Sequence, residues 1–269
     1  MKKTKNPYSG IFFLLTFSIS WLFWGLLVFT GLPLDNVLGL ILFILAGSGP
    51  PLSAILLIYH QGDKTIIRDY WQRLLSFRRL GWKGAIISLF CVPILTLVAG
   101  FAANIFYRNG GISLEPQFRS NLISLIPFGI FTLLYGPLPE EMGWRGYALD
   151  QLQKKLNVVA ASLILGLLWA LWHLPMFFIP GTYQNALLEN LQALILFPVK
   201  IILHTLIMTW IFLYTQRSTL SAVLYHFSIN FSGETFFLSS PGEMILLVIL
   251  AFLATTVAIH LKKRSIIPT

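Results

Sequence analysis

Two adjacent carboxylates and an arginine stand in an otherwise apolar part of the chain. The stretch PLPEEMGWRGYALDQL, residues 137–152, contains Glu140, Glu141 and Arg145. Ionisable residues at membrane depth are costly and by default mark a functional interior. Glu141 and Arg145 are four residues apart, so a helix places them on one face, where arginine can bind a carboxylate bidentately. Glu140 points about 100° away. We therefore expect Glu141–Arg145 to be a structural pair and Glu140 to be the free carboxylate.

Small and helix-breaking residues flank this pair. Gly143 and Gly146 offer small surfaces that allow a neighbouring helix to approach closely. Pro137 and Pro139 interrupt the helix just before the pair and free backbone groups there. The segment is therefore expected to be tightly packed and locally irregular.

Two further apolar stretches carry polar residues that could join Glu140. The stretch LLWALWHLPMFF contains His173, and LYHFSINFSG contains His226 and Asn230, which are four residues apart and share a helical face. Glu140 and His173 are equally distant from a turn near residues 156–157, so an antiparallel hairpin brings them to the same height. A carboxylate, two imidazoles and an amide can then converge. The remaining histidines are expected to be hydrogen-bonded core residues; they are His60, His204 and His260.

This set of side chains lacks a serine or cysteine nucleophile, so water is the natural nucleophile. Glu140 would act as general base, and His173 would orient the water or donate a proton to the leaving amine. His226 and Asn230 would donate hydrogen bonds to the developing oxyanion. The chemistry that the residues predict is peptide hydrolysis inside a membrane.

Composition places the chain outside the soluble class. It has 269 residues, of which 56% are hydrophobic and 11% charged, and its mean hydropathy is +0.76; soluble domains carry about 25% charged residues. We therefore expect an all-α, polytopic integral membrane protein with a single domain over residues 1–269. The lone Cys91 cannot form an intrachain disulfide. The net charge of +9 is explained by membrane topology, so lipids are expected partners and nucleic acid is not.

A bilayer core needs about 20 apolar residues per helix, and eight candidate spans follow. They are about 11–31, 37–60, 84–106, 121–138, 157–178, 190–215, 218–238 and 242–261. If both termini are cytoplasmic, most lysine and arginine residues lie on the cytoplasmic side of the membrane. These are Lys2, Lys3, Lys5, Lys64, Arg68, Arg73, Arg78, Arg79, Lys83, Arg145, Lys154, Lys155, Arg217, Lys262, Lys263 and Arg264. Arg108 and Arg119 fall outside, and Lys200 falls within a span. The membrane would be the plasma membrane in a prokaryote and the endoplasmic reticulum in a eukaryote.

The connection between spans two and three has its own pattern. From Asp63 to Lys83, aromatic and aliphatic residues interleave with arginines. This is typical of an amphipathic basic helix that lies in the cytoplasmic interface against anionic headgroups. A docking surface for a substrate tail is the alternative.

Three motifs over about residues 120–235 resemble a known family. In chain order they are Glu140-Glu141-x-x-x-Arg145, Trp169-x-x-x-His173 and His226-x-x-x-Asn230. On a chain of eight spans they resemble the CAAX-processing and bacteriocin-processing (CPBP, or Abi) intramembrane proteases, which include the type II CAAX prenyl endopeptidases. Trp169 stands where the family commonly has phenylalanine, and it keeps the aromatic character.

The resemblance implies a function and residue roles. Glu140 and His173 would activate water, and His226 and Asn230 would form the oxyanion hole in a cavity open to the cytosol. The substrate would be a prenylated protein C-terminal tail or a related membrane peptide. Family members are described both as metalloproteases and as glutamate-dependent proteases. The set Glu140, His173 and His226 could hold Zn²⁺, but nothing in the spacing requires a metal. A metal-free mechanism without cofactors is therefore favoured.

Two other functions are compatible with parts of the pattern. The alternative function is a non-catalytic bacteriocin-immunity or scaffold membrane protein that binds a peptide partner in the same cavity. A transporter could use Glu140 and the histidines as a proton relay. The chain lacks paired, Gly/Pro-broken segments in matching halves, which disfavours a transporter.

Overall fold

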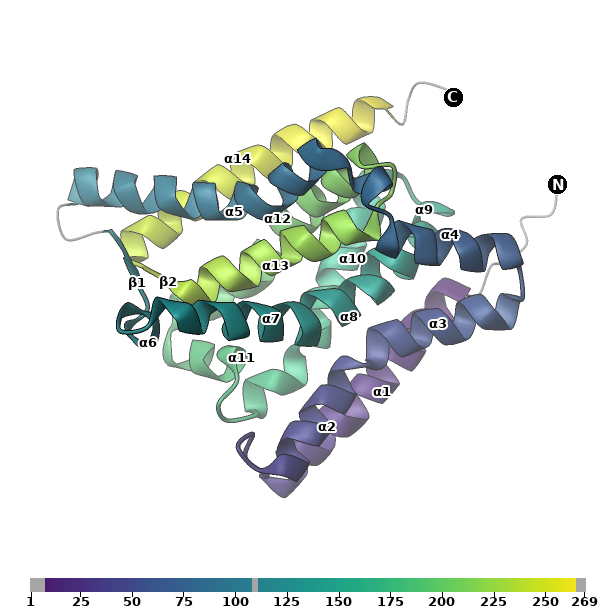
Figure 1. Cartoon of the computed structure of the whole chain (residues 1–269), viewed down its shortest axis with the longest axis horizontal. Helices are drawn as coiled ribbons and strands as arrows, with labels where there is room; N and C mark the ends of the chain where they lie inside the picture. The colour runs from purple at the N-terminus through teal and green to yellow at the C-terminus, as the bar shows by residue number, and fades with distance from the viewer. Residues whose placement is uncertain (1–7, 108–110, 265–269) are drawn as a thin grey trace.

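The protein is a bundle of helices (Figure 1), and the computed structural model describes residues 8–107 and 111–264. Elements of the first half are α1 (Tyr8–Thr30), α2 (Val37–Gly47), α3 (Gly49–Gln61), α4 (Lys64–Leu75), α5 (Phe77–Tyr107), β1 (Ile112–Leu114), α6 (Pro116–Arg119), η1 (Leu122–Ser124) and α7 (Leu125–Tyr135). Elements of the second half are α8 (Pro137–Gly143), η2 (Trp144–Ala148), α9 (Leu149–Gln153), α10 (Val158–Trp172), η3 (Leu174–Phe178), α11 (Tyr183–Ala186), η4 (Leu187–Glu189), α12 (Leu191–Tyr214), α13 (Thr219–Thr235), β2 (Phe236–Leu238) and α14 (Ser240–Arg264). The predicted polytopic helical class is confirmed.

The number of long apolar spans differs from the predicted eight. Six helical stretches of the described residues are long and apolar enough to cross a membrane, and the pair α2–α3 makes a seventh if it is one bent span. The remaining predicted span corresponds to α13, which has only 17 residues and carries His226 and Asn230. It is shorter than the roughly 20 residues that a bilayer requires. We therefore describe six or seven spans, with α13 as a shorter helix among them.

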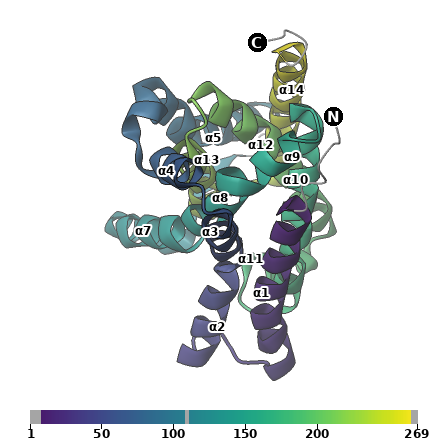
Figure 2. The same cartoon turned by 90° about the vertical axis from the view of Figure 1, so that its right-hand side faces the viewer.

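The bend between α2 and α3 has a clear local cause. The two helices meet at 45°, and Pro50 and Pro51 occupy the first turn of α3. Proline lacks the backbone N–H needed to continue the preceding helix. In Figure 2, α1 and α2 run side by side and project from the rest of the bundle.

Two short strands were not predicted. β1 pairs with β2 antiparallel, with Ile112 opposite Leu238 and Leu114 opposite Phe236. β2 lies inside the segment that the hydropathy pattern assigned to a span, because its Phe-Phe-Leu sequence is as apolar as a membrane helix. The β1–β2 pair joins the connection that follows α5 to the end of α13 (Figure 1).

The outer surface is apolar, as expected for a protein in lipid. Many large hydrophobic side chains are exposed, including Phe29 on α1, Ile105 on α5 and Phe252 on α14. Soluble monomers rarely expose such extensive apolar surface. The arrangement fits a bundle whose outer face contacts acyl chains.

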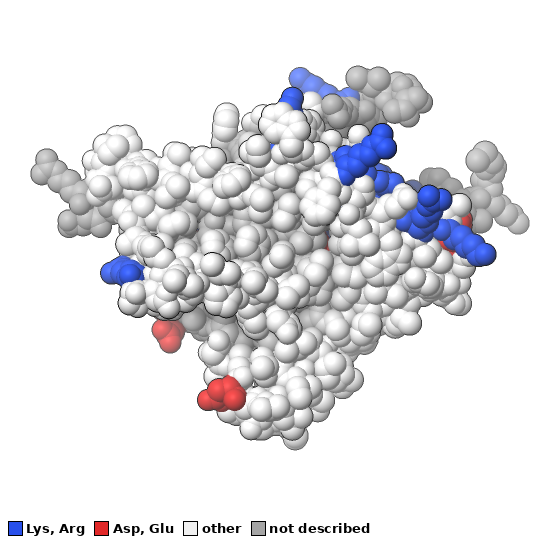
Figure 3. All heavy atoms as spheres, in the orientation of Figure 1, with Lys and Arg blue, Asp and Glu red and all other residues white. Residues whose placement is uncertain are grey.

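Cations gather on one side of the bundle. The start of α1, α4 and the end of α14 lie on this side (Figures 1 and 2), and Figure 3 shows Lys and Arg side chains along it. Arg73 and Arg145, which the topology counted among the cytoplasmic cations, are instead buried in the protein, with 5% and 0% exposure. Both are paired with carboxylates. These two residues therefore do not indicate which side of the membrane is cytoplasmic. Lys2, Lys3, Lys5 and Arg108 lie outside the described residues.

The core is built around aromatic side chains and a central helix. Trp172 at the end of α10 packs on Trp24 of α1, with ring centroids 4.6 Å apart, and on Trp144 of η2 at 5.7 Å. Helix α13 packs against α5, α7, α8 and α12. Because α13 carries His226 and Asn230, this central position brings them next to α8.

The α8 segment packs as tightly as its glycines predicted. A Cβ added to Gly143 would lie 2.8 Å from the backbone carbonyl carbon of Pro50 in α3, and one added to Gly146 would lie 2.9 Å from the Tyr70 ring in α4. Backbone cannot move aside as a flexible side chain can. Gly143 therefore allows α8 to contact the bend of α3.

We predict that Gly143→Ala destabilises the protein by about 1–3 kcal/mol, because the new methyl group overpacks the contact with Pro50. The measurement is the midpoint of thermal unfolding in detergent. Gly25→Ala on α1 is the matched control, since no atom lies within 4 Å of its added Cβ. Equal unfolding midpoints for the two variants would contradict the prediction.

Candidate active site

A buried carboxylate connects α8, η2 and α13. Glu141 Oε1 lies 2.8 Å from Arg145 Nη1 and 3.0 Å from His226 Nδ1, and Arg145 Nη1 also contacts Oε2 at 2.9 Å. Glu141 and Arg145 have no exposed surface, and His226 is 4% exposed. The structure thus contains the ion pair expected from the four-residue spacing. A single guanidinium nitrogen makes both contacts, which differs from the expected fork.

The Glu141 carboxylate sets the orientation of the His226 ring. An ionised carboxylate only accepts hydrogen bonds, so Nδ1 carries the proton and donates it to Glu141. Nε2 of His226 is then left for another partner. Carboxylate–histidine pairs of this kind fix the tautomer and the direction of the ring. Spacing alone did not predict that Glu141 would act on His226.

Trp169 of α10 lies among the polar groups. Its indole Nε1–H donates to Glu140 Oε2 at 2.7 Å, and its carbonyl oxygen lies 2.8 Å from His173 Nδ1. Its ring centroid lies 4.9 Å from that of His226, and the Arg145 guanidinium carbon lies 4.9 Å from it as well. The last contact is a cation–π arrangement. Trp169 therefore holds Glu140 and His173 in one place.

Glu140 and Asn230 both lie close to Gly136. A Cβ placed on Gly136 would lie 3.4 Å from Asn230 Nδ2 and 4.0 Å from Glu140 Oε1. Gly136 separates α7 from α8 with a non-helical backbone, and Pro137 starts the next helix. The predicted break before the pair is therefore present, and it lies next to both the carboxylate and the amide.

His173 is held at the end of α10. Its Nδ1 faces the Trp169 carbonyl, so a neutral ring donates from Nδ1 and keeps a lone pair on Nε2. Trp172 and Phe197 pack edge-on against the ring at 4.9 and 5.5 Å. The side chain is 7% exposed. An oriented lone pair of this kind can accept a proton from water.

The predicted site residues thus come together, and two contributors were missed. Glu140, His173 and His226 all contact Trp169, and Asn230 approaches Glu140 beside Gly136. The indole donor one helical turn before His173 was a usable signal for Trp169. Gly136 carried a weaker signal, because a glycine before two prolines only indicates a helix break.

Of the three histidines that the sequence assigned to the core, one is buried and two are exposed. His204 is buried, and its Nδ1 lies 3.1 Å from the Tyr225 hydroxyl, as predicted. His60 and His260 are exposed near the ends of α3 and α14, so the core assignment is wrong for both. Helix ends reach the membrane interface, where a polar ring tip is readily solvated.

The proposed metal ligands do not form a ready-made metal site. Within the described part of the chain, no three His, Cys, Asp or Glu side chains are close enough together to hold a metal ion. Glu140, His173 and His226 are instead arranged around the Trp169 side chain. In this arrangement Glu140 Oε2 and the Nδ1 atoms of both histidines bind protein groups: an indole, a carboxylate and a carbonyl.

Fold and site together define a polytopic helical membrane protein with a buried carboxylate–histidine centre. Residues 122–232 match the family model described as type II CAAX prenyl endopeptidase Rce1-like. The chain is also similar to CAAX prenyl protease 2 of Methanococcus maripaludis, with 27% identity over 271 aligned positions that cover 96% of this chain and 95% of that protein. The resemblance that the three motifs predicted is confirmed.

We predict that Arg145→Met destabilises the fold by about 3–5 kcal/mol, because it leaves the buried Glu141 carboxylate without its cation. Adding Glu141→Leu to this variant should restore much of the lost stability, since both charges are then gone. Thermal unfolding of the single and double variants checks both statements. Arg145→Met with wild-type stability would contradict the account of the pair.

Proposed function

We propose that the protein is an intramembrane endopeptidase that hydrolyses a peptide bond close to the membrane, with a prenylated CAAX tail or a related membrane peptide as substrate. The arrangement around Glu140 carries the proposal: Trp169 holds one of its oxygens, and the other oxygen and the Asn230 amide both lie close to Gly136. His173 lies one turn after Trp169 at the end of α10, with an oriented ring. Similarity to a protein named as a CAAX prenyl protease supports this substrate class.

Glu140 is the general base in the proposed mechanism. A water between Glu140 Oε1 and His173 Nε2 gives a proton to the carboxylate as its oxygen attacks the scissile carbonyl carbon. The tetrahedral intermediate then collapses, the C–N bond breaks, and the proton passes from Glu140 to the leaving nitrogen. His173 holds the water in line during the first step.

His226 and Asn230 stabilise the oxyanion in this proposal. The Asn230 amide donates directly from Nδ2. Donation from His226 Nε2 requires the imidazolium form, whose charge the Glu141 carboxylate faces at 3.0 Å from Nδ1. Preorganised donors in a buried site supply a large part of such catalysis.

We also propose that the mechanism is metal-free and that both termini are cytoplasmic. Glu140, His173 and His226 do not form a close three-ligand cluster in the described part of the chain, which supports the former. The gathering of exposed cations near α4 and the end of α14 supports the latter (Figure 3). A substrate tail would then reach the site from the cytoplasm.

We predict that purified Glu140→Ala has no measurable cleavage of a farnesylated CAAX peptide, because the base for water is lost. His173→Ala and His226→Ala should also abolish cleavage, and Asn230→Ala should lower kcat by about 10²–10³. Glu189→Ala, which removes an exposed carboxylate, is the control and should retain full activity. Full activity in Glu140→Ala would end the proposal, whereas a cellular phenotype preserved in Glu140→Gln would favour the non-catalytic alternative.

Metal dependence is tested separately. We predict that the wild-type protein keeps its cleavage rate after dialysis against a chelator, since Glu140 and His173 activate water directly. The initial rate with and without chelator is the measurement. Loss of activity on chelation that is restored by Zn²⁺ would overturn the metal-free mechanism.

A further inference from the structure

One face of α4 is turned into the protein, although the sequence marked this helix as a surface element. Tyr70, Arg73 and Leu74 are buried, whereas Lys64 and Arg68 are exposed. A buried arginine needs partners for its charge and its donors. The positions of those partners show which segments the inner face of α4 contacts.

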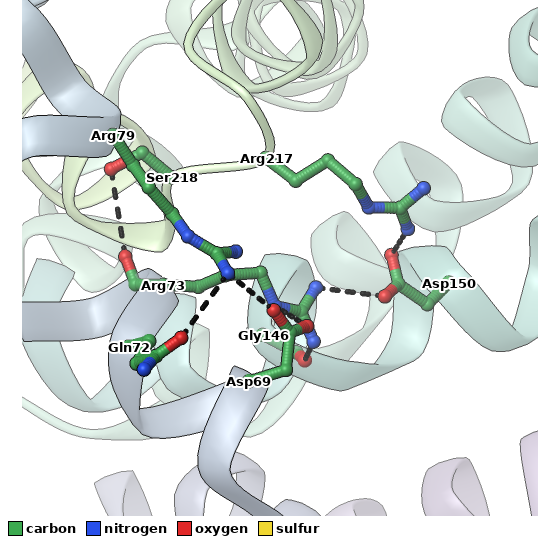
Figure 4. A network of polar contacts seen from close by, with 8 residues as sticks. All are labelled: Asp69, Gln72, Arg73, Arg79, Gly146, Asp150, Arg217 and Ser218. Atoms are coloured by element: carbon green, nitrogen blue, oxygen red, sulfur yellow. Dashed lines mark hydrogen bonds and ion pairs between the residues drawn. The ribbon is translucent and has the colours of Figure 1, made fainter. Parts of the chain in front are cut away.

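The Arg73 guanidinium makes two hydrogen bonds and one further ion-pair contact (Figure 4). Nη1 lies 2.8 Å from Asp150 Oδ2 in α9, and Nη2 donates to the carbonyl oxygen of Gly146 at 3.3 Å. Nε lies 3.0 Å from Asp69 Oδ2 on α4 itself. Only arginine has the planar fork for such a set of contacts.

Tyr70 adds a second contact one turn earlier on α4. Its hydroxyl donates to the Met142 carbonyl oxygen at 3.2 Å, and its ring packs where a Gly146 side chain would stand. Two side chains of α4 therefore contact the backbone on either side of Arg145. The Gly146 contact lies within the π-helical turn η2, a type of local widening that is frequent at functional sites.

The same network reaches the start of α13. Asp150 also pairs with Arg217, and the Ser218 hydroxyl lies 3.5 Å from the Arg73 carbonyl oxygen (Figure 4). Arg217 and its neighbour Gln216 have positive φ angles of 61° and 53°, which are uncommon for residues other than glycine. A costly turn between α12 and α13 thus presents Arg217 to Asp150.

We propose that α4 is a positioning clamp for the catalytic centre, a role that rests on the proposed function. Arg73 and Tyr70 fix the turn that carries Arg145, and Arg145 holds Glu141, which orients His226. Asp150 and Arg217 tie the same turn to the base of α13. Tyr70, Arg73 and Asp150 are positioning residues that set how His226 faces Glu140, without contact with substrate.

The test compares Arg73→Gln with Arg68→Gln, a matched change on the exposed face of the same helix. Arg73→Gln leaves Asp150 paired with Arg217 and Asp69 paired with Arg79, so no carboxylate loses all its partners. We expect kcat on a farnesylated CAAX peptide to fall about 10- to 100-fold, the cost of a small misplacement of reacting groups. KM and the unfolding midpoint should stay near the wild-type values. Arg68→Gln should leave all three unchanged.

Two further variants keep the proposal falsifiable if Arg73→Gln folds poorly. Tyr70→Phe removes only the hydroxyl bonded to Met142 and should lower kcat without a change in KM. Arg73→Lys keeps the charge but cannot reach Asp150, Asp69 and Gly146 together, so it should restore stability more than kcat. Wild-type kcat in Tyr70→Phe and Arg73→Lys would overturn the clamp. Absence of cleavage by the wild-type protein would instead overturn the proposed function and, with it, the clamp.

Discussion

The site depends on one constraint: the charges of Glu141 and Arg145 are completely buried. Removing each ion from water costs several kcal/mol, and only close, well-directed contacts offset this cost. Glu141 therefore has to face Arg145 one turn away, and the remaining capacity of its Oε1 is used by His226 from α13. The same requirement fixes the approach of α13 to α8, and α13 also brings Asn230 to Gly136. A pair that looks like local helix stabilisation thus determines the arrangement of three helices.

This constraint gives two neighbouring glutamates different environments. Glu141 binds cationic and imidazole donors with both oxygens, so it is committed to structure. Glu140 points elsewhere on the helix and accepts a hydrogen bond from the Trp169 indole. A buried carboxylate that is not part of the arginine pair is suited to proton transfer. The chemistry proposed for the protein follows from this difference.

The sequence predicted the helical membrane class and the Glu141–Arg145 pair, because hydropathy and helical period are local properties. It overestimated the number of spans, since hydropathy does not distinguish the 17-residue α13 and the β2 strand from a longer helix. It also treated α4 as an interfacial helix throughout. The inward turn of Arg73 depends on Asp150 and Gly146, which are distant in sequence. Likewise, the hydrogen bond from Trp169 to Glu140 joins residues that are 29 positions apart in the sequence.

The most direct test measures cleavage rate and unfolding midpoint on the same preparations of two isosteric variants, Glu140→Gln and Glu141→Gln. Each removes one negative charge from adjacent positions while leaving the shape of the side chain. The account predicts that Glu140→Gln loses cleavage of a farnesylated CAAX peptide and keeps a near wild-type midpoint. Glu141→Gln should lower the midpoint strongly, because Arg145 is left buried without a carboxylate. The two variants behaving alike in both measurements would contradict the division of roles between Glu140 and Glu141.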